Sequence, residues 1–283
     1  MDPVQAFETF SEEKRTALDF ALKDPEVRHR ELSWRMIEQD VAYLSASTVY
    51  RILRGNELMH QQRGRTKRYR DEKDKASAPD KIWATNLMYV SVGGQQSYLV
   101  TFIDEYSRYL VHWELLSLMD GHSISVAAQR AIETLPAGED GKPSVKPMIR
   151  SDNGSGYISG EFVGLLSHHQ LTHRRIWPHC PKENGVQERF NRTLREAMEG
   201  HELNGRYDTQ EVIGSLIDHY NEVRLHSSLG FQTPATWYRG DPSKVDRARR
   251  LKLSQARHRR KQINLGIRQR TLPLSTPEPV PCS

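Results

Sequence analysis

The stretch WATNLMYVSVGGQQSYLVTFI, residues 83–103, decides the fold of this chain. Apolar and polar side chains alternate loosely over residues 83–92, which predicts a strand. The sequence Gly-Gly-Gln-Gln at 93–96 supplies a turn, and residues 97–103 predict a second strand. A third strand is predicted over residues 109–115. This part of the chain is therefore expected to form an antiparallel meander.

The next segments extend the meander into a larger sheet. A helical pattern over residues 123–135 leads through a loop to the short apolar strand 147–149. Since strand–helix–strand connections normally return in parallel, this fourth strand is expected beside the first. A fifth strand after Leu171 and helices over 185–199 and 209–220 complete an α/β fold: a mixed five-stranded sheet with flanking helices.

The N-terminal residues 1–58 predict helices. One is expected from Asp24 to Asp40, with Asp24-Pro25 as its start signal, and a second lies within residues 44–54 after a Ser cap. Such a pair has the form of a helix-turn-helix, although a plain helical hairpin fits the same pattern. The residues expected to face outward, and to bind DNA in the first case, are Ser47, Thr48, Arg51 and Arg54.

Positive charge is concentrated at two places in a chain whose net charge is +5. Residues 244–270 contain eleven Lys or Arg and one acid, and a second basic run covers residues 63–70 within a linker predicted over 59–79. Two basic segments favour a polyanionic partner, because each neutralised phosphate releases counterions; solvated surface charge is the alternative. The basic residues predicted to bind DNA are Arg63, Arg65, Lys67, Arg68, Arg70, Arg249, Arg250, Arg257, Arg259 and Arg260.

The composition narrows the class of protein. No apolar stretch is long enough for a membrane span, and the start Met1-Asp2-Pro3 lacks the order of a signal peptide. Two cysteines cannot build a disulfide framework. A soluble cytoplasmic protein is expected, with a Pro-rich, disordered tail at its C-terminus.

Two acidic residues stand where catalytic chemistry is favoured. Asp152 follows the fourth strand, and Glu188 lies in the first turn of a helix, with 35 residues between them. Two-metal phosphoryl transfer needs a cluster of carboxylates, since Mg²⁺ prefers oxygen ligands. Taken singly, an acid of either kind is structural in most proteins, because a surface Asp is common and Glu at a helix N-terminus favours the helix dipole.

Three segments carry a resemblance to a known family: IRSDNGS at 149–155, PHCPKENGVQERF at 178–190 and YNEVRLHSSLGFQTP at 220–234. They resemble the signature blocks of integrase-core DDE transposases of bacterial insertion sequences, which are related to retroviral integrases. The resemblance implies a ribonuclease-H-like catalytic core, assigned to residues 80–240, with Asp152 and Glu188 as its last two catalytic acids. It further implies two Mg²⁺ ions, with Mn²⁺ as a substitute, and cleavage and 3′-hydroxyl transfer of DNA.

The partners implied by the resemblance are double-stranded transposon-end and target DNA, a homo-oligomer at least dimeric on DNA, and a small accessory protein from the same element. A nucleoid-associated location follows from binding DNA. The segment 241–283 is then a basic DNA-binding extension. His179, Lys182 and Asn184 are expected near the scissile phosphate. Arg192 and Arg195 are expected either to hold phosphates or to pair with Glu188 and Glu199.

One position departs from the family pattern. Asn86 stands where the family would place its first catalytic Asp, so the site lacks one negative charge between two cations and the chain is expected to be catalytically impaired. Asp104 is the obvious replacement. In a hairpin closed around Gly94-Gln95, however, Asn86 faces about Ile103, which puts Asp104 on the opposite face.

The sequence bears on three alternatives to an active transposase or to its metal site. A non-catalytic DNA-binding repressor derived from a transposase is supported by Asn86, and a structure-selective nuclease is disfavoured by the predicted helix-turn-helix. A zinc site is not expected, because the available histidines and Cys180 lack a paired ligand spacing. The histidines considered are His168, His169, His173 and His179.

Overall fold

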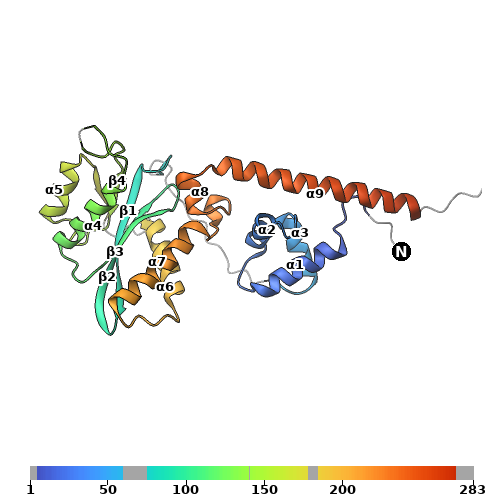
Figure 1. Cartoon of the computed structure of the whole chain (residues 1–283), viewed down its shortest axis with the longest axis horizontal. Coiled ribbons are helices and arrows are strands. Elements are labelled where there is room, and N and C mark those ends of the chain that lie inside the picture. Colours follow the sequence, from blue (N-terminus) through green and yellow to red (C-terminus); the bar gives the residue numbers. More distant parts are fainter. Residues whose placement is uncertain (1–4, 60–74, 140, 178–183, 272–283) are drawn as a thin grey trace, which may run out of the picture. The chain divides into compact units, whose positions relative to one another are not determined.

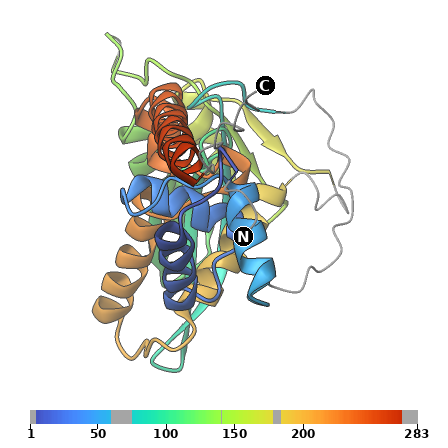
Figure 2. The ribbon, with the colours of Figure 1, turned by 90° about the vertical axis from the view of Figure 1, so that its right-hand side faces the viewer.

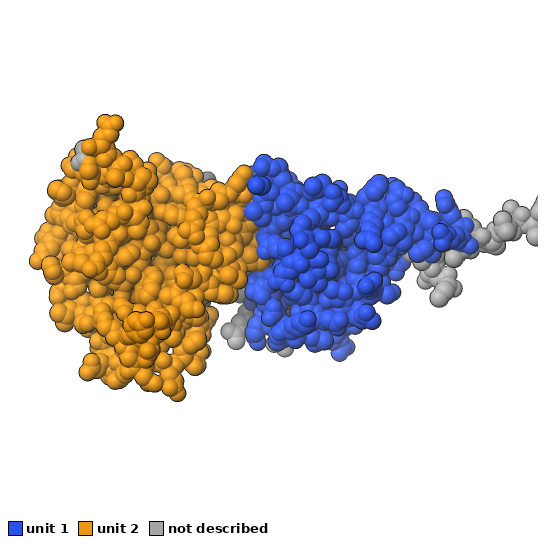
Figure 3. All heavy atoms as spheres, viewed as in Figure 1, with its two compact units in different colours: residues 1–65, 243–283 blue, residues 66–242 orange. Residues whose placement is uncertain are grey.

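The computed structural model describes residues 5–59, 75–139, 141–177 and 184–271. The chain divides into two compact units, one made of residues 1–65 and 243–283 and the other of residues 66–242 (Figure 3). Within the described residues, no helix combines the length and the apolar character needed to cross a membrane.

The second unit is built on a five-stranded sheet with the order β3-β2-β1-β4-β5. Its strands are β1 (Ile82–Val92), β2 (Gln95–Asp104), β3 (Leu110–Leu116), β4 (Met148–Ser151) and β5 (His173–Arg175). The first three pair antiparallel, whereas β4 is parallel to β1 and β5 is parallel to β4. The predicted mixed sheet is confirmed.

Helices cover both faces of this sheet (Figure 1). Trp83 packs into a core shared with α4 (Gly121–Glu133) and α5 (Gly160–His168). The next residue, Ala84, packs into a core shared with α6 (Gly185–Met198) and α7 (Arg206–Glu222). The alternation seen in the sequence thus separates two helical layers, as expected of a ribonuclease-H-like fold. The helices α5 and α8 (Pro234–Arg239) were not predicted.

The β1–β2 turn differs by one residue from its predicted place. Val92 pairs with Gln95, and the turn residues Gly93 and Gly94 have φ of 55° and 79°, which favours glycine at both. A Cβ on Gly93 would lie 2.7 Å from the Asn204 carbonyl oxygen. Asn86 consequently faces Thr101 and not Ile103. Moving the turn by one residue shifts the partner of each β1 residue by two. Because side chains alternate with a period of two, the sheet face assigned to each side chain is unchanged.

The first unit contains α1 (Ser11–Lys23), α2 (His29–Glu38) and α3 (Ala46–Gly55), packed around a common apolar core. The prediction of a helix starting at Asp24 was wrong, because Asp24 ends α1 and Arg28 precedes α2. The Ser cap is confirmed: the Ser45 hydroxyl accepts a hydrogen bond from the Thr48 amide at 3.3 Å. Such a cap fixes where α3 begins.

A long helix, α9 (Pro242–Thr271), completes the first unit (Figures 1 and 2). The Asn264 amide donates to the carbonyl oxygens of Gln5 at 3.2 Å and Glu8 at 2.9 Å. Lys252 forms an ion pair with Asp40. The prediction of a separate C-terminal extension is therefore corrected, since residues 243–271 are an integral part of the N-terminal helical unit.

Two arginines of α9 are buried, which corrects their assignment to DNA. Arg249 is 3% exposed, pairs with Glu38 and lies 4.7 Å above the Trp34 ring. Arg260 is 8% exposed and donates to the Tyr43 carbonyl oxygen at 2.6 Å. A guanidinium in such surroundings holds the helices together and is not available to a phosphate. Of the predicted set in α9, the exposed residues are Arg250, Arg257 and Arg259.

Candidate functional site

The parallel pairing of β1 with β4 brings Asn86 toward Asp152. The paired residues run from Ile82 opposite Met148 to Ala84 opposite Arg150. Continuing the same register by two residues sets Asn86 opposite Asp152, directly after β4. Since neighbouring strands lie about 4.8 Å apart, the two side chains belong to one small region at the sheet edge.

The start of α6 is fixed against the same region. Gln187, which is fully buried, donates a hydrogen bond from Nε2 to the Thr101 hydroxyl. Thr101 is the strand partner of Asn86 and donates to its carbonyl oxygen at 3.4 Å. Glu188 follows Gln187 in the first turn of α6 and is exposed. The contacts of Gln187 therefore set Glu188 on the sheet face that Asn86 shares.

Local hydrogen bonds orient the side chains of β1 and of the turn after β4. The Asn86 Nδ2 donates to the Leu87 carbonyl oxygen at 3.0 Å. Asp152 Oδ1 accepts the Gly154 amide at 2.9 Å, so the turn holds the carboxylate. Next to them, the Tyr157 and Thr85 hydroxyls lie 3.0 Å apart. Burial raises the pKa of Tyr157, and the charge of Asp152 raises it further, so this hydroxyl stays protonated.

The donor set fits a hard divalent cation only in part. Asp152 and Glu188 supply carboxylate oxygens, and within the described residues neither forms an ion pair. Asn86 has its amide nitrogen engaged and can offer one neutral oxygen. In the part of the chain that the structure describes, no group of three or more His, Cys, Asp or Glu side chains is arranged to hold a metal. Two carboxylates suit Mg²⁺, whereas the neutral amide of Asn86 adds no negative charge to them.

Asp104 has a structural role. It is fully buried and accepts hydrogen bonds from the Asp80 amide at 2.9 Å and from the Ser107 amide and hydroxyl at 2.7 and 2.6 Å. Burial raises the pKa of the Asp104 carboxyl. Because it is the strand partner of Trp83, it lies on the face opposite Asn86. The Asp104 carboxylate is therefore held away from the Asn86 side chain.

The predicted DNA contacts in the core and in the linker before it separate into three groups. Arg192 and Arg195 are exposed, and neither forms an ion pair with any described residue, so the alternative of pairing with Glu188 and Glu199 is not seen. Asn184 is only 7% exposed, which corrects its assignment to the DNA surface. The residues that lie outside the described ones are Arg63, Arg65, Lys67, Arg68, Arg70, His179 and Lys182.

Most of the side chains on α3 that were predicted to contact DNA are exposed. Ser47, Arg51 and Arg54 are exposed. Thr48 is half-buried, and its hydroxyl lies 2.9 Å from the Ser45 hydroxyl at the helix cap. Three of the four side chains are thus available to a partner.

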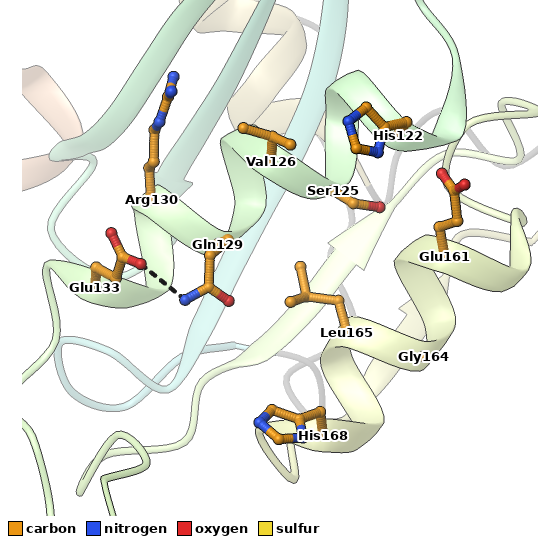
Figure 4. Close-up of a pocket in the computed structure, with 10 residues that line it drawn as sticks. All are labelled: His122, Ser125, Val126, Gln129, Arg130, Glu133, Glu161, Gly164, Leu165 and His168. Atoms are coloured by element: carbon orange, nitrogen blue, oxygen red, sulfur yellow. Dashed lines mark hydrogen bonds between the residues drawn. The ribbon is translucent and has the colours of Figure 1, made fainter.

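The histidines near α4 and α5 contact residues other than Asn86 and Asp152. His169 Nε2 lies 2.7 Å from the Gln129 side-chain oxygen, and His173 Nε2 lies 2.9 Å from the Ser151 hydroxyl. His168 lines an open pocket between α4 and α5, together with residues such as Leu165 (Figure 4). These two helices cover the sheet face opposite α6, so this pocket is separate from Asn86.

Sequence reasoning missed two features that support the site. Arg150, two residues before Asp152, forms a 2.8 Å ion pair with Glu105, and both side chains are almost fully buried. Gln187 occupies an inward position of α6 among Val186 and Phe190. A charged residue inside a short apolar strand and an amide on the buried face of a helix were the available signals.

Comparisons with known proteins place the chain in a family. Residues 76–181 match the family model described as "Integrase core domain", and residues 169–234 match a second model with the same description. Together the two matches span more than half of the chain.

Two curated relatives from insertion elements agree with this match, and one solved structure is reported beside them for its similarity alone. The chain is 26% identical over 228 residues to an uncharacterized 39.2 kDa protein of insertion element IS476 from Xanthomonas euvesicatoria, covering 77% of this chain and 64% of that protein. It is 27% identical over 164 residues to the transposase for insertion sequence element IS904 from Lactococcus lactis, covering 56% and 62%. The HTLV-2 integrase catalytic core domain, solved in complex with magnesium, has a TM-score of 0.45 at 17% identity, covering 58% of this chain and 99% of that domain.

The chain spans less than two thirds of the length of the curated relatives named above. Its own sheet order, helical layers and signature segments agree with the two family matches. The chain therefore belongs to the integrase-core family, whose members include insertion-sequence transposases.

Proposed function

We propose that this chain is a DNA transposase subunit that binds transposon-end DNA and carries a strand-transfer site formed by Asp152, Glu188 and Asn86. The observation that carries the proposal is the register of β1 and β4, which sets Asn86 opposite Asp152 on the face covered by α6. Relatives named as insertion-sequence transposases support it. We further propose that Asn86 makes the site catalytically impaired.

In the proposed reaction, Asp152 and Glu188 hold Mg²⁺, or Mn²⁺ in its place. The chemistry that Mg²⁺ supplies at such carboxylates is activation of water or a 3′-hydroxyl and stabilisation of the leaving oxygen. The Gly154 amide holds the Asp152 carboxylate, and the hydrogen bond from Gln187 to Thr101 fixes the start of α6, which carries Glu188. Arg192 and Arg195, exposed on the helix of Glu188, are proposed to hold DNA phosphates.

Asn86 weakens the site through charge. An amide has nearly the shape of a carboxylate but is neutral, so phosphate oxygens and two carboxylates alone must balance the cations. The loss of several kcal/mol of metal binding is the expected consequence, on the order of a thousandfold or more in rate.

Replacing Asn86 by Asp tests the proposed function. The Asn86→Asp variant and the unchanged chain are incubated with labelled transposon-end DNA, target DNA and Mg²⁺, and joined products are separated on a denaturing gel. Joined products only with the Asp form are expected. Equal joining by both forms would contradict the impairment, and absence of end binding by both would contradict the function itself.

A second candidate is a DNA-binding repressor descended from a transposase. Asn86 favours it, because a repressor needs end recognition without catalysis. It is the better description if both forms bind the ends and neither cleaves nor joins them. In the transposase case, two ends are joined in concert, so we also propose a homo-oligomer on DNA.

Neighbouring arginines on α9 provide a matched test of DNA binding by the first unit. Arg250→Gln is expected to reduce the slope of log affinity against log salt by about 1, because an exposed phosphate contact is lost. Arg249→Gln is expected to leave that slope unchanged and to destabilise the unit, since Arg249 pairs with Glu38. Salt-dependent fluorescence anisotropy and thermal unfolding separate the two effects. An equal salt slope for Arg250→Gln and the parent would contradict the assignment of Arg250.

A further inference from the structure

A residue with a hydroxyl group precedes each of the two proposed site residues in the sheet. Thr85 precedes Asn86 in β1, and Ser151 precedes Asp152 at the end of β4. Each hydroxyl residue lies two positions after a strand residue of the core beneath α4 and α5. Because side chains alternate along a strand, both hydroxyl groups lie on that face, opposite the Asn86 side chain. Both residues are almost fully buried, so their hydroxyl groups need hydrogen-bond partners within the protein.

A histidine of β5 holds the residue before Asp152. The Ser151 hydroxyl donates to the Asp152 carbonyl oxygen at 2.8 Å, and His173 Nε2 lies 2.9 Å from the same hydroxyl. A serine hydroxyl has one hydrogen and a carbonyl oxygen can only accept, so His173 donates its Nε2 hydrogen to Ser151. The Ile176 amide adds a main-chain contact, since it donates to the Ser151 carbonyl oxygen at 3.0 Å. The backbone at Asp152 is therefore fixed to β5 and to the residue that follows it.

A tyrosine holds the residue before Asn86 in a similar way. The Tyr157 and Thr85 hydroxyls lie 3.0 Å apart. Tyr157 belongs to the turn after Asp152, and its amide donates to the Gly154 carbonyl oxygen at 3.0 Å. The Tyr157 side chain thus connects the turn that carries Asp152 with the strand that carries Asn86.

The Phe162 ring of α5 packs against both of these residues. It lies 5.3 Å from the Tyr157 ring at an interplanar angle of 77°, and 5.3 Å from the His173 ring at 72°. Edge-to-face packing of this kind restricts the orientation of both rings. Tyr157 and Phe162 are fully buried. The rear cluster, defined as Thr85, Ser151, Tyr157, Phe162 and His173, therefore joins β1, β4 and β5 behind the proposed site.

We propose that His173 and Tyr157 are positioning residues of the strand-transfer site, which fix the separation of Asp152 and residue 86 from the opposite sheet face. The inference rests on the proposed function and adds to it two residues that act through Ser151 and Thr85. The geometry of a metal site depends on the groups that hold its ligands. Loss of one such group typically lowers metal affinity or activity by about 10- to 100-fold.

Two substitutions in the full-length Asn86→Asp chain test the positioning role. Tyr157→Phe removes one hydroxyl and keeps the buried ring, whereas His173→Phe keeps a ring against Phe162 and removes the Nε2 hydrogen. Each is expected to weaken Mn²⁺ binding by about tenfold or more in calorimetric titration. Each should also lower the kcat of strand joining by a similar factor, with the KM for end DNA within about twofold of its starting value.

Two further variants separate positioning from a general loss of stability. His173→Gln can still donate to Ser151, so it is expected to recover part of the Mn²⁺ affinity and of kcat. His169→Phe is the matched control, because His169 Nε2 contacts the Gln129 side chain outside the rear cluster. It should change neither quantity. Urea unfolding of every variant shows which of them remain folded, and either Tyr157→Phe or His173→Phe suffices if the other does not fold.

Nitrogen-15 NMR of the unchanged chain gives a readout that needs neither metal nor DNA. Burial lowers the pKa of His173, so its ring is neutral at physiological pH. The Nε2–H tautomer is expected for His173, and Ser151→Ala, which removes the acceptor, should weaken that preference. The Nδ1–H tautomer in the unchanged chain would overturn the hydrogen bond on which the inference depends.

The outcomes distinguish the inference from the proposed function. If Asn86→Asp binds Mn²⁺ and neither Tyr157→Phe nor His173→Phe changes that affinity, the inference is overturned and the proposed function stands, even where the free energy of unfolding falls. If Asn86→Asp neither binds Mn²⁺ nor joins DNA, both are overturned.

Discussion

In the Asn86→Asp background, replacing Asp152 by Asn is expected to reduce strand joining by about a thousandfold or more, on the order of 4 kcal/mol in the activation free energy. Asp152 is one of two carboxylates at the sheet edge, and the backbone amide of Gly154 already holds it in place. Asn can keep that hydrogen bond but removes a negative charge. The fold should therefore persist while metal binding falls.

Two measurements separate this effect from misfolding. Gel assays of joined DNA give the rate, and calorimetric titration with Mg²⁺ or Mn²⁺ gives the metal affinity. Glu188→Gln is expected to behave like Asp152→Asn. Glu196→Gln, an exposed acid two turns further along α6, serves as the control and should change neither quantity. Full activity of Asp152→Asn would rule out Asp152 as a metal ligand.

Replacing Arg150 by Met is expected to lower the free energy of unfolding of the second unit by about 3–5 kcal/mol. Arg150 pairs with Glu105 at 2.8 Å, and their side chains are 3% and 2% exposed. Removing the guanidinium leaves a buried carboxylate without its counter-charge. Since Asp152 lies two residues further on, its position is expected to loosen as well.

A double-mutant cycle provides the control for Arg150. Adding Glu105→Gln to Arg150→Met removes the uncompensated charge, so the double variant is expected to recover part of the lost stability. Urea unfolding followed by tryptophan fluorescence measures each step. The Glu105→Gln single variant completes the cycle, and if the losses of the two single variants add up to the loss of the double variant, the ion pair contributes no coupling.

Some features of the site and of the sheet could be predicted from the sequence, whereas the exact strand register could not. The proposal that Asp152 and Glu188 are the two catalytic acids comes from their motifs. The sheet face of Asp104 was predicted from strand alternation and is confirmed. The hairpin turn was predicted at Gly94-Gln95, one residue after its position at Gly93-Gly94, because the composition of residues 93–96 is compatible with both registers. Only the pairing of Val92 with Gln95 distinguishes them.

For the basic C-terminal segment, the sequence could not predict which arginines are buried and which are exposed. Its charge predicted a nucleic-acid extension, yet Arg249 and Arg260 face the N-terminal helices while Arg250 and Arg259 face solvent. Adjacent positions of one helix differ by about 100° in direction. Which of them is buried depends on where Glu38 and Glu13 lie, and these are more than two hundred residues away in sequence.

By itself the sequence determined the periodicities, and hence the strands, the two sheet faces and the identity of the two acids and of Asn86. These features are local, because the 2.0- and 3.6-residue periods and the turn glycines act within a few residues. The tertiary structure alone decided the register that sets Asn86 opposite Asp152, the burial of Arg150 with Glu105 and the packing of α9 on the first unit. Each joins segments far apart in the chain, and a charge becomes structural or available only when its distant partner is in place.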